Sequence, residues 1–392
     1  MQRKTYAGIN GDTLKKNTEE ILKEYRDYKY YIGVVKNNAY HHGMRCVLDL
    51  IRGGINYLAV SSLEEAFQVR KYNQEIPILC LEPISLENID DAINANITIT
   101  IDSLEYVQDL SQKDLFAPLK IHIAIDSGMN RLGIKTRTEL NASVELIKNT
   151  KKLELEGIYT QFATSGITDP FWDKQLSTYE EITSDIDLAQ IKIVHLGRSL
   201  TLVNHKKIPY ANGVRLGIIL YGFSQSKKEG KSLREKLRRI KMKYLQKKNH
   251  CSETTLSNSL KLNTAMSLYS HVISTRKVKK GEVVGYNTYK IEEDGYVGTI
   301  AIGYADGVTK KFGQVCINGK YCDIISDSMD MIMVYSKEKI ELNEKVEIFG
   351  ENISISEVCQ RCQINAYHLF NQISNRVTRI HTSNSEKEEI NY

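Results

Sequence analysis

The strongest constraint on the fold is a regular alternation of short apolar runs and helix-length amphipathic segments between residues 31 and 222. Such apolar runs are typical of buried strands, and the segments between them have helical periodicity. Repeated β–α units at near-regular spacing favour a parallel (β/α)8 barrel, whose active site lies at the carboxyl ends of the strands. The predicted strands are Tyr31–Val35, Tyr57–Val60, Pro77–Leu81, Ile97–Ile101, Lys120–Ile125, Leu153–Tyr159, Ile191–Leu196 and Val214–Tyr221.

The pattern changes after residue 262 to short alternating strands separated by turn signals, as in SHVISTRKVKKGEVVGYNTY. This pattern predicts a mostly antiparallel β domain. We therefore expect a barrel over residues 11–262 and a β domain over residues 263–384, which the N-terminal strand in residues 1–10 joins. The polar tail, residues 385–392, is expected to be disordered.

Composition indicates an ordinary globular protein, with 41% hydrophobic and 26% charged residues. We find no apolar run of membrane-spanning length and no secretory signal. The seven cysteines are scattered and odd in number, which predicts reduced thiols and a cytoplasmic location. Cys359 and Cys362 form a lone CxxC pair that we interpret as one face of a helix, so no metal site is expected.

Basic residues are concentrated in one segment, which we treat as an insert over residues 223–262. Between Lys227 and Lys248 there are eleven Lys or Arg and two Glu, so the rest of the chain is mildly acidic. A solvated helical or disordered excursion is the simplest interpretation. We therefore expect no nucleic-acid or membrane partner, although residues 227–248 leave both open.

Lys36 follows the first predicted strand directly, in the sequence YIGVVKNNAYHHG. A lysine at the carboxyl end of a barrel strand lies at the expected active site. When its amine is desolvated, a lysine can form a Schiff base with an aldehyde. The same pattern would arise if the side-chain stem packed and the ammonium reached water.

Other strand ends add polar groups to the same edge of the barrel. Arg131 follows the fifth strand, Arg198 and Ser199 follow the seventh, and Arg215 and Gly217 lie on the eighth. A glycine backbone and a serine hydroxyl there predict a phosphate cradle. Taken singly, each arginine could instead be half of a structural ion pair, and the glycine could mark a strand bulge. A lysine at the first strand together with a phosphate site at the last two suggests pyridoxal phosphate.

The motif VVKNNAYHHG resembles the VVKANAYGHG signature of alanine racemases. The resemblance continues through DSGMNRLGI, GIYTQFAT, GVRLGIILYG, VVGYNTY, TIAIGYADG, ISDSMDMIMV and INAYHLFNQISNRVTRI, and it covers nearly the whole chain apart from residues 223–262. It implies a homodimeric, pyridoxal-phosphate-dependent enzyme that interconverts L-alanine and D-alanine. It also implies that the product D-alanine supplies peptidoglycan.

The resemblance also implies roles for individual residues. Lys36 would form the Schiff base and act as the base on the D-amino acid, and Tyr286, from the partner subunit, would act on the L-amino acid. Arg215 would face the pyridine nitrogen. The resemblance places the cofactor phosphate against Tyr40, Ser199, Gly217, Ile218 and Tyr367, the substrate carboxylate against Arg131 and the Met329 backbone, and Tyr304 and Tyr367 at the substrate entrance.

The chain departs from the family pattern at four places around the cofactor. Ala124 stands where the family usually has a lysine, Gln161 replaces a histidine, and Arg198 replaces an asparagine. The segment GYNTY is one residue shorter than the usual GYGATY. These differences leave open a racemase of serine or another amino acid, or a degenerate, non-catalytic homologue that binds pyridoxal phosphate.

Overall fold

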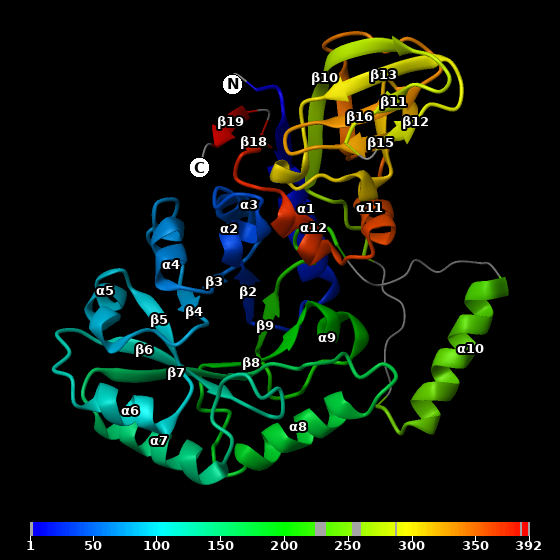
Figure 1. The fold of residues 1–392 in the computed structure, drawn as a ribbon. Helices are drawn as coiled ribbons and strands as arrows, with labels where there is room; N and C mark the ends of the chain where they lie inside the picture. Colours follow the sequence, from blue (N-terminus) through cyan, green and yellow to red (C-terminus); the bar gives the residue numbers. More distant parts are fainter. Residues whose placement is uncertain (1–2, 224–232, 253–259, 287, 385, 391–392) are drawn as a thin grey trace.

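The computed structural model describes residues 3–223, 233–252, 260–286, 288–384 and 386–390. Within this part, a closed barrel of parallel strands is followed by a separate β domain (Figure 1). The barrel strands are β2 (Tyr30–Val34), β3 (Tyr57–Val60), β4 (Ile78–Cys80), β5 (Ile97–Ile101), β6 (Leu119–Ile125), β7 (Leu153–Thr160), β8 (Ile193–Arg198) and β9 (Gly213–Leu216). The predicted fold class is confirmed.

Helices connect the barrel strands, and side-chain caps show why several begin where they do. Ser62, Ser103 and Thr136 each accept a hydrogen bond from the backbone N–H three residues later. Such caps satisfy a donor that has no partner inside the helix. The helices are α1 (Gly11–Glu24), α2 (Lys36–Tyr40), α3 (Cys46–Arg52), α4 (Leu63–Arg70), α5 (Ile89–Asn94), α6 (Leu104–Ser111), α7 (Arg137–Asn149), α8 (Phe171–Ile182) and α9 (Ser199–Asn204), with a 3-10 turn, η1 (Leu86–Asn88).

The last barrel strand is shorter than the sequence pattern predicts. It ends at Leu216 rather than Tyr221, because the chain turns directly after Gly217. The N–H of Leu220 donates to the carbonyl of Gly217 at 2.9 Å, and the N–H of Gly222 donates to that of Ile219 at 3.1 Å. These turn bonds replace strand pairing, so the apolar run GIILYG caps the barrel end instead of extending it.

The β domain contains one large sheet with the order β13-β16-β15-β14-β17-β10-β1-β18-β19. Strand β1 lies between β10, its antiparallel neighbour, and β18, its parallel neighbour. The first strand of the chain is therefore part of this sheet. The strands of the large sheet are β1 (Tyr6–Asn10), β10 (Met266–Val278), β13 (Gly295–Ile300), β14 (Gln314–Ile317), β15 (Lys320–Asp327), β16 (Ile332–Ser336), β17 (Lys345–Phe349), β18 (Thr378–Ser383) and β19 (Glu386–Ile390). A separate two-stranded sheet pairs β11 (Val283–Val284) with β12 (Tyr289–Lys290), and the 3-10 turns are η2 (Tyr304–Asp306) and η3 (Lys310–Phe312).

The expectation of a disordered tail is wrong for residues 386–390. These residues form β19, which pairs antiparallel with β18. Arg45 Nε also donates to Glu388 Oε2 at 2.9 Å, which ties the strand to the barrel side of the molecule. The polar composition concealed this strand because β18 offers an open backbone edge that pairs with almost any sequence.

Two helices, α11 (Ile355–Cys362) and α12 (Ala366–Gln372), follow the large sheet strands. Gln363 separates them in a left-handed conformation, with φ +55°. The domains meet near α12, where Arg379 Nε donates to the carbonyl of His41 at 3.0 Å. Arg379 lies on β18, and its Nη2 also donates to the carbonyl of Ile373, directly after α12, at 2.7 Å. Helix α12 itself packs beside α2, where the Tyr367 ring contacts the Tyr40 ring (Figure 1).

Part of the basic insert lies outside the described residues, namely 224–232 and 253–259. Between these two stretches the chain forms α10 (Leu233–Lys248). In the described part of the chain, no helix combines the length and the apolar character needed to cross a bilayer.

Candidate active site

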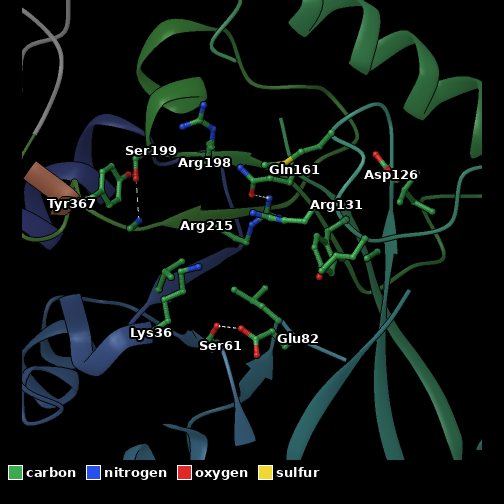
Figure 2. Close-up of a pocket in the computed structure, with 18 of the residues that line it drawn as sticks. Lys36, Ser61, Glu82, Asp126, Arg131, Gln161, Arg198, Ser199, Arg215 and Tyr367 are labelled. Carbon is green, nitrogen blue, oxygen red and sulfur yellow. Dashed lines mark hydrogen bonds between the residues drawn. The ribbon is translucent and has the colours of Figure 1, made fainter. Parts of the chain in front are cut away.

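A cavity of about 360 Å³ opens at the carboxyl ends of the barrel strands (Figure 2). It lies where a (β/α)8 barrel is expected to hold its functional groups. The predicted residues that line it are Lys36, Tyr40, Arg131, Ser199, Arg215, Gly217 and Tyr367. They come from both ends of the barrel sequence and from the β domain, so only the folded chain brings them together.

Lys36 is half-buried directly beyond β2, and its amine points into the cavity (Figure 2). Among the residues that the structure describes, none makes a hydrogen bond or an ion pair with Lys36 Nζ. The amine is therefore available to a ligand.

The segment after Lys36 has an unusual backbone that the sequence analysis missed. Asn37 through His41 are all left-handed, with φ between +51° and +61°. This conformation costs about 1–2 kcal/mol per L-residue, and Asn tolerates it best. The N–H of Ala39 donates to the carbonyl of Val35 at 2.8 Å and stabilises the turn. The cluster of Asn and His in NNAYHH was the available signal.

Ser199 and Gly217 lie together in the cavity wall, and we call this pair the cradle. The N–H of Gly217 donates to Ser199 Oγ at 3.0 Å, and a Cβ at Gly217 would lie 2.8 Å from the Tyr40 hydroxyl oxygen. Glycine therefore keeps the space beside the two hydroxyls open. The ring of Tyr367, on α12, packs against Tyr40 with the centroids 5.7 Å apart. Ile218 is buried next to this cradle and lines a small adjoining cavity rather than the main one.

Arg215 is buried in the floor of the cavity, and protein acceptors hold its guanidinium. Nη1 donates to the carbonyl of His195 at 2.6 Å, and Nη2 donates to the carbonyl of Thr160 at 2.6 Å. Burial lowers the pKa of Arg215 to about 10, so the guanidinium stays protonated at neutral pH. The group presents a positive charge in a defined orientation.

A chain of buried polar side chains extends from Arg215 through the barrel interior. Arg215 Nη1 lies 2.8 Å from His195 Nδ1, and His195 Nε2 lies 2.8 Å from His122 Nδ1. His122 Nε2 lies 3.3 Å from Glu156 Oε2. Because a guanidinium only donates, we assign each imidazole as acceptor at Nδ1 and donor at Nε2. We call Arg215, His195, His122 and Glu156 the barrel relay.

The ionisation of the barrel relay agrees with this order. Burial, together with the charge of Arg215, lowers the pKa of His195 well below its usual value, and burial also lowers that of His122. Burial would raise the pKa of Glu156, but hydrogen bonds from His122, Lys192 and Tyr57 outweigh it and hold that pKa well below its usual value. Two neutral imidazoles, those of His195 and His122, therefore connect the Arg215 guanidinium to the Glu156 carboxylate through hydrogen bonds. Sequence analysis singled out Arg215 but missed His122, Glu156 and His195, because nothing in the sequence of β6, β7 or β8 marks these side chains as buried partners.

Three of the four departures from the family pattern, Ala124, Gln161 and Arg198, line the cavity. The fourth, the shortened GYNTY segment, does not line it and includes Asn287, which lies outside the described residues. Ala124 is buried in the cavity wall, and Arg131, which is exposed, has no hydrogen bond or ion pair within the described part of the chain. Gln161 Oε1 accepts from Arg215 Nη2 at 3.1 Å. Arg198 Nε donates to the carbonyl of Phe162 at 3.1 Å, so part of its guanidinium is already engaged at the cavity rim (Figure 2).

The remaining predicted residues lie on the β domain and do not line this cavity. Tyr286, Tyr304 and Met329 are 86%, 52% and 54% exposed. The N–H of Ala305, next to Tyr304, donates to the carbonyl of Met329 at 2.9 Å, and Gly285 lies against Ser326. We call Tyr286, Tyr304 and Met329 the exposed tyrosine surface. None of the three is among the described residues that line the cavity.

Comparison with known proteins decides the family. The family model for the alanine racemase N-terminal domain matches residues 9–225, and the model for the C-terminal domain matches residues 265–381. The chain belongs to the alanine racemase family. Membership confirms the resemblance seen in the sequence and identifies the chain as an isomerase of the amino-acid racemase class.

Individual members of the alanine racemase family resemble this chain over nearly its full length. The alanine racemase of Streptococcus equi subsp. equi is 30% identical over 97% of this chain and 98% of its own. Among solved structures, alanine racemase from Bacillus anthracis with bound L-Ala-P has a TM-score of 0.84 at 30% identity, covering 100% of this chain and 98% of its own. Alanine racemase from Clostridium difficile has a TM-score of 0.85 at 29% identity, covering 100% and 99%.

Proposed function

We propose that this protein is a cytoplasmic, pyridoxal-phosphate-dependent alanine racemase that acts as a homodimer and supplies D-alanine for peptidoglycan. The observation that supports this most directly is the convergence of three groups in one cavity. These are the unengaged amine of Lys36, the cradle of Ser199 and Gly217, and the buried guanidinium of Arg215.

These residues fit the cofactor. The gap that glycine leaves beside the hydroxyls of Tyr40 and Ser199 suits a phosphate, which accepts hydrogen bonds from hydroxyl and backbone donors. Lys36 would hold the aldehyde carbon, and Arg215 would face the ring nitrogen. When bound, pyridoxal phosphate supplies an aldehyde for covalent attachment of amines and a ring that withdraws electrons from the carbon that loses its proton.

Racemisation requires proton transfer at both faces of one carbon, so two bases must oppose each other. Lys36 Nζ would remove or return the proton on one face. The phenol of Tyr286 from the partner subunit would do so on the other, because within one chain Tyr286 is 86% exposed and lies outside the cavity. The exposed tyrosine surface supports a dimer in which each subunit completes the other's site.

The alternative substrates also have support in the cavity. Arg131 would bind a substrate carboxylate, and its guanidinium has no anionic partner among the described residues. Ala124 presents only a methyl group to the same cavity. A small side chain there leaves room for an amino acid larger than alanine, so serine or another amino acid is the second candidate substrate.

Proton exchange of L-alanine in deuterated buffer, followed by chiral analysis, tests the proposed reaction with cofactor-loaded protein. We expect loss of the α-proton together with formation of D-alanine. Exchange with serine or a larger amino acid but not with alanine would favour the second substrate, and no exchange with any amino acid would refute the racemase proposal.

Mixing two inactive variants tests whether the site is shared. Lys36→Ala and Tyr286→Phe should each lose about 10³-fold in racemisation rate. Co-refolded in equal amounts, they should regain about a quarter of the wild-type activity, because half of the dimers are mixed and each contains one intact site. Tyr321→Phe, at another exposed tyrosine of the β domain, is the matched control. No recovery would show that both bases act within one subunit.

A further inference from the structure

Helix α10 lies outside both family matches, which end at residue 225 and resume at residue 265. It projects beside the barrel, on the side of α8 and α9 (Figure 1). Its sixteen residues include eight Lys or Arg and one Glu. Most of the excess positive charge of the basic segment lies in this helix, and the chain outside that segment is mildly acidic.

The helix also exposes an apolar stripe. Leu237, Ile240 and Tyr244 are 59%, 65% and 63% exposed. Their spacing of three and four residues places them on one face. Lys236, Lys241 and Lys247 lie beside this stripe and are also exposed. We call Leu237, Ile240 and Tyr244 the α10 stripe.

The carboxyl-terminal end of the helix is attached to the barrel, and the stripe is not used for that attachment. Beyond the helix, Asn249 Nδ2 donates to the carbonyl of Thr168, and the N–H of Ser252 donates to Asp173 Oδ2 at 3.0 Å. Met242 and Leu245, which lie away from the α10 stripe, are the half-buried apolar residues. The helix is therefore held at its end while the stripe faces solvent.

We propose that α10 docks this protein on the surface of an anionic lipid bilayer. An interfacial helix buries apolar side chains among the acyl chains near the headgroups while flanking lysines contact the anionic headgroups. The α10 stripe supplies the apolar side chains, and the neighbouring lysines supply the contacts with the headgroups. A nucleic acid would satisfy the basic residues but leave the stripe in water, because its affinity comes mainly from phosphate contacts. The stripe is the observation that favours a membrane.

The acidic charge on the rest of the chain has a further consequence. An anionic surface repels the body of the protein and attracts only α10. Docking should therefore be reversible and should leave the active-site cavity facing water. It should also weaken with salt, because screening shortens the range of the attraction from about 10 Å at 0.1 M to about 3 Å at 1 M.

Vesicle co-sedimentation of the full-length, cofactor-loaded protein tests this proposal. The vesicles are phosphatidylglycerol mixed with phosphatidylcholine in equal parts, and phosphatidylcholine alone is the comparison. Glutamine is used for the substitutions because it preserves helix propensity. The apolar variant is Leu237→Gln, Ile240→Gln and Tyr244→Gln, the charge variant is Lys236→Gln, Lys241→Gln and Lys247→Gln, and the control is Leu342→Gln, at an exposed leucine of the β domain.

We expect binding to the anionic vesicles at least tenfold tighter than to neutral ones. Both the apolar and the charge variant should lose at least tenfold, while the control binds like the wild type and all variants keep their racemase activity. Unchanged vesicle binding by the apolar variant, or no binding by the wild type, would overturn the proposal. Binding to single-stranded RNA without binding to vesicles would also overturn the proposal. The same holds if the only effect of the variants is a change in oligomeric state.

Discussion

Glu156 is the anion at the end of the barrel relay, and its removal should destabilise the whole barrel. The carboxylate accepts hydrogen bonds from Tyr57 OH at 2.7 Å, from His122 Nε2 at 3.3 Å and from Lys192 Nζ at 2.7 Å. Glu156→Ala leaves the first two donors buried without this acceptor, although Tyr57 keeps a contact with Thr98 Oγ1 at 2.9 Å.

The size of the effect follows from the burial of each donor. A buried donor that loses its acceptor costs about 1–3 kcal/mol, and Tyr57 falls at the lower end because of its second partner. The side chain of Lys192 is 56% exposed, so its ion pair contributes at most about 1 kcal/mol. We therefore expect Glu156→Ala to lower the free energy of unfolding by about 3–5 kcal/mol. Glu156→Gln, which keeps one acceptor oxygen, should lose about 1–2 kcal/mol.

Equilibrium urea unfolding of the cofactor-loaded protein at pH 7.5, followed by circular dichroism, measures these losses. Glu154→Ala is the matched control, because Glu154 lies on the same strand and is exposed. It should change the free energy of unfolding by less than about 0.5 kcal/mol. A loss below about 1 kcal/mol in Glu156→Ala, or equal losses in the Ala and Gln variants, would refute the claim that hydrogen bonding at Glu156 stabilises the barrel.

Two further predictions follow from the buried groups. Stability should fall as the pH is lowered from 7.5 to 5, because the pKa of each fully buried imidazole lies below its unfolded value and only the unfolded chain takes up the proton. Each such imidazole should cost up to about 2 kcal/mol at pH 5, as measured by urea unfolding, and a flat profile would contradict this. The imidazoles concerned are His42, whose pKa burial lowers to about 3, His122 and His195. Gly217→Ala should weaken binding of pyridoxal phosphate about tenfold in a cofactor titration, because the added methyl meets the Tyr40 hydroxyl. Gly8→Ala, whose methyl meets nothing closer than 3.8 Å, should leave cofactor binding unchanged.

The position of Lys36 and the barrel around it were predictable from sequence because both depend on local patterns. An apolar run that ends in a lysine specifies a buried strand and a polar group at its carboxyl end. The same reasoning predicted the cradle of Ser199 and Gly217. Family motifs added Tyr286, Tyr304 and Met329, which no local pattern in the chain would single out. The structure places these three on an exposed surface, and their assignment to a shared site stays a prediction.

The tertiary structure alone decided features that depend on contacts between distant residues. His122 and His195 interrupt apolar runs, and Glu156 follows a polar–apolar alternation in which it would share the outward face with Glu154. Only the pairing of β6, β7 and β8 brings the three within hydrogen-bonding distance. The polar segment of β19 becomes a strand only because β18 offers it a backbone edge. Periodicity reports which face of a segment is apolar, but a buried polar group is tolerated only where the fold supplies its partner. The sequence by itself therefore determined the barrel and the end of it at which the predicted site residues gather around a cavity, and tertiary packing decided which polar groups are joined inside it.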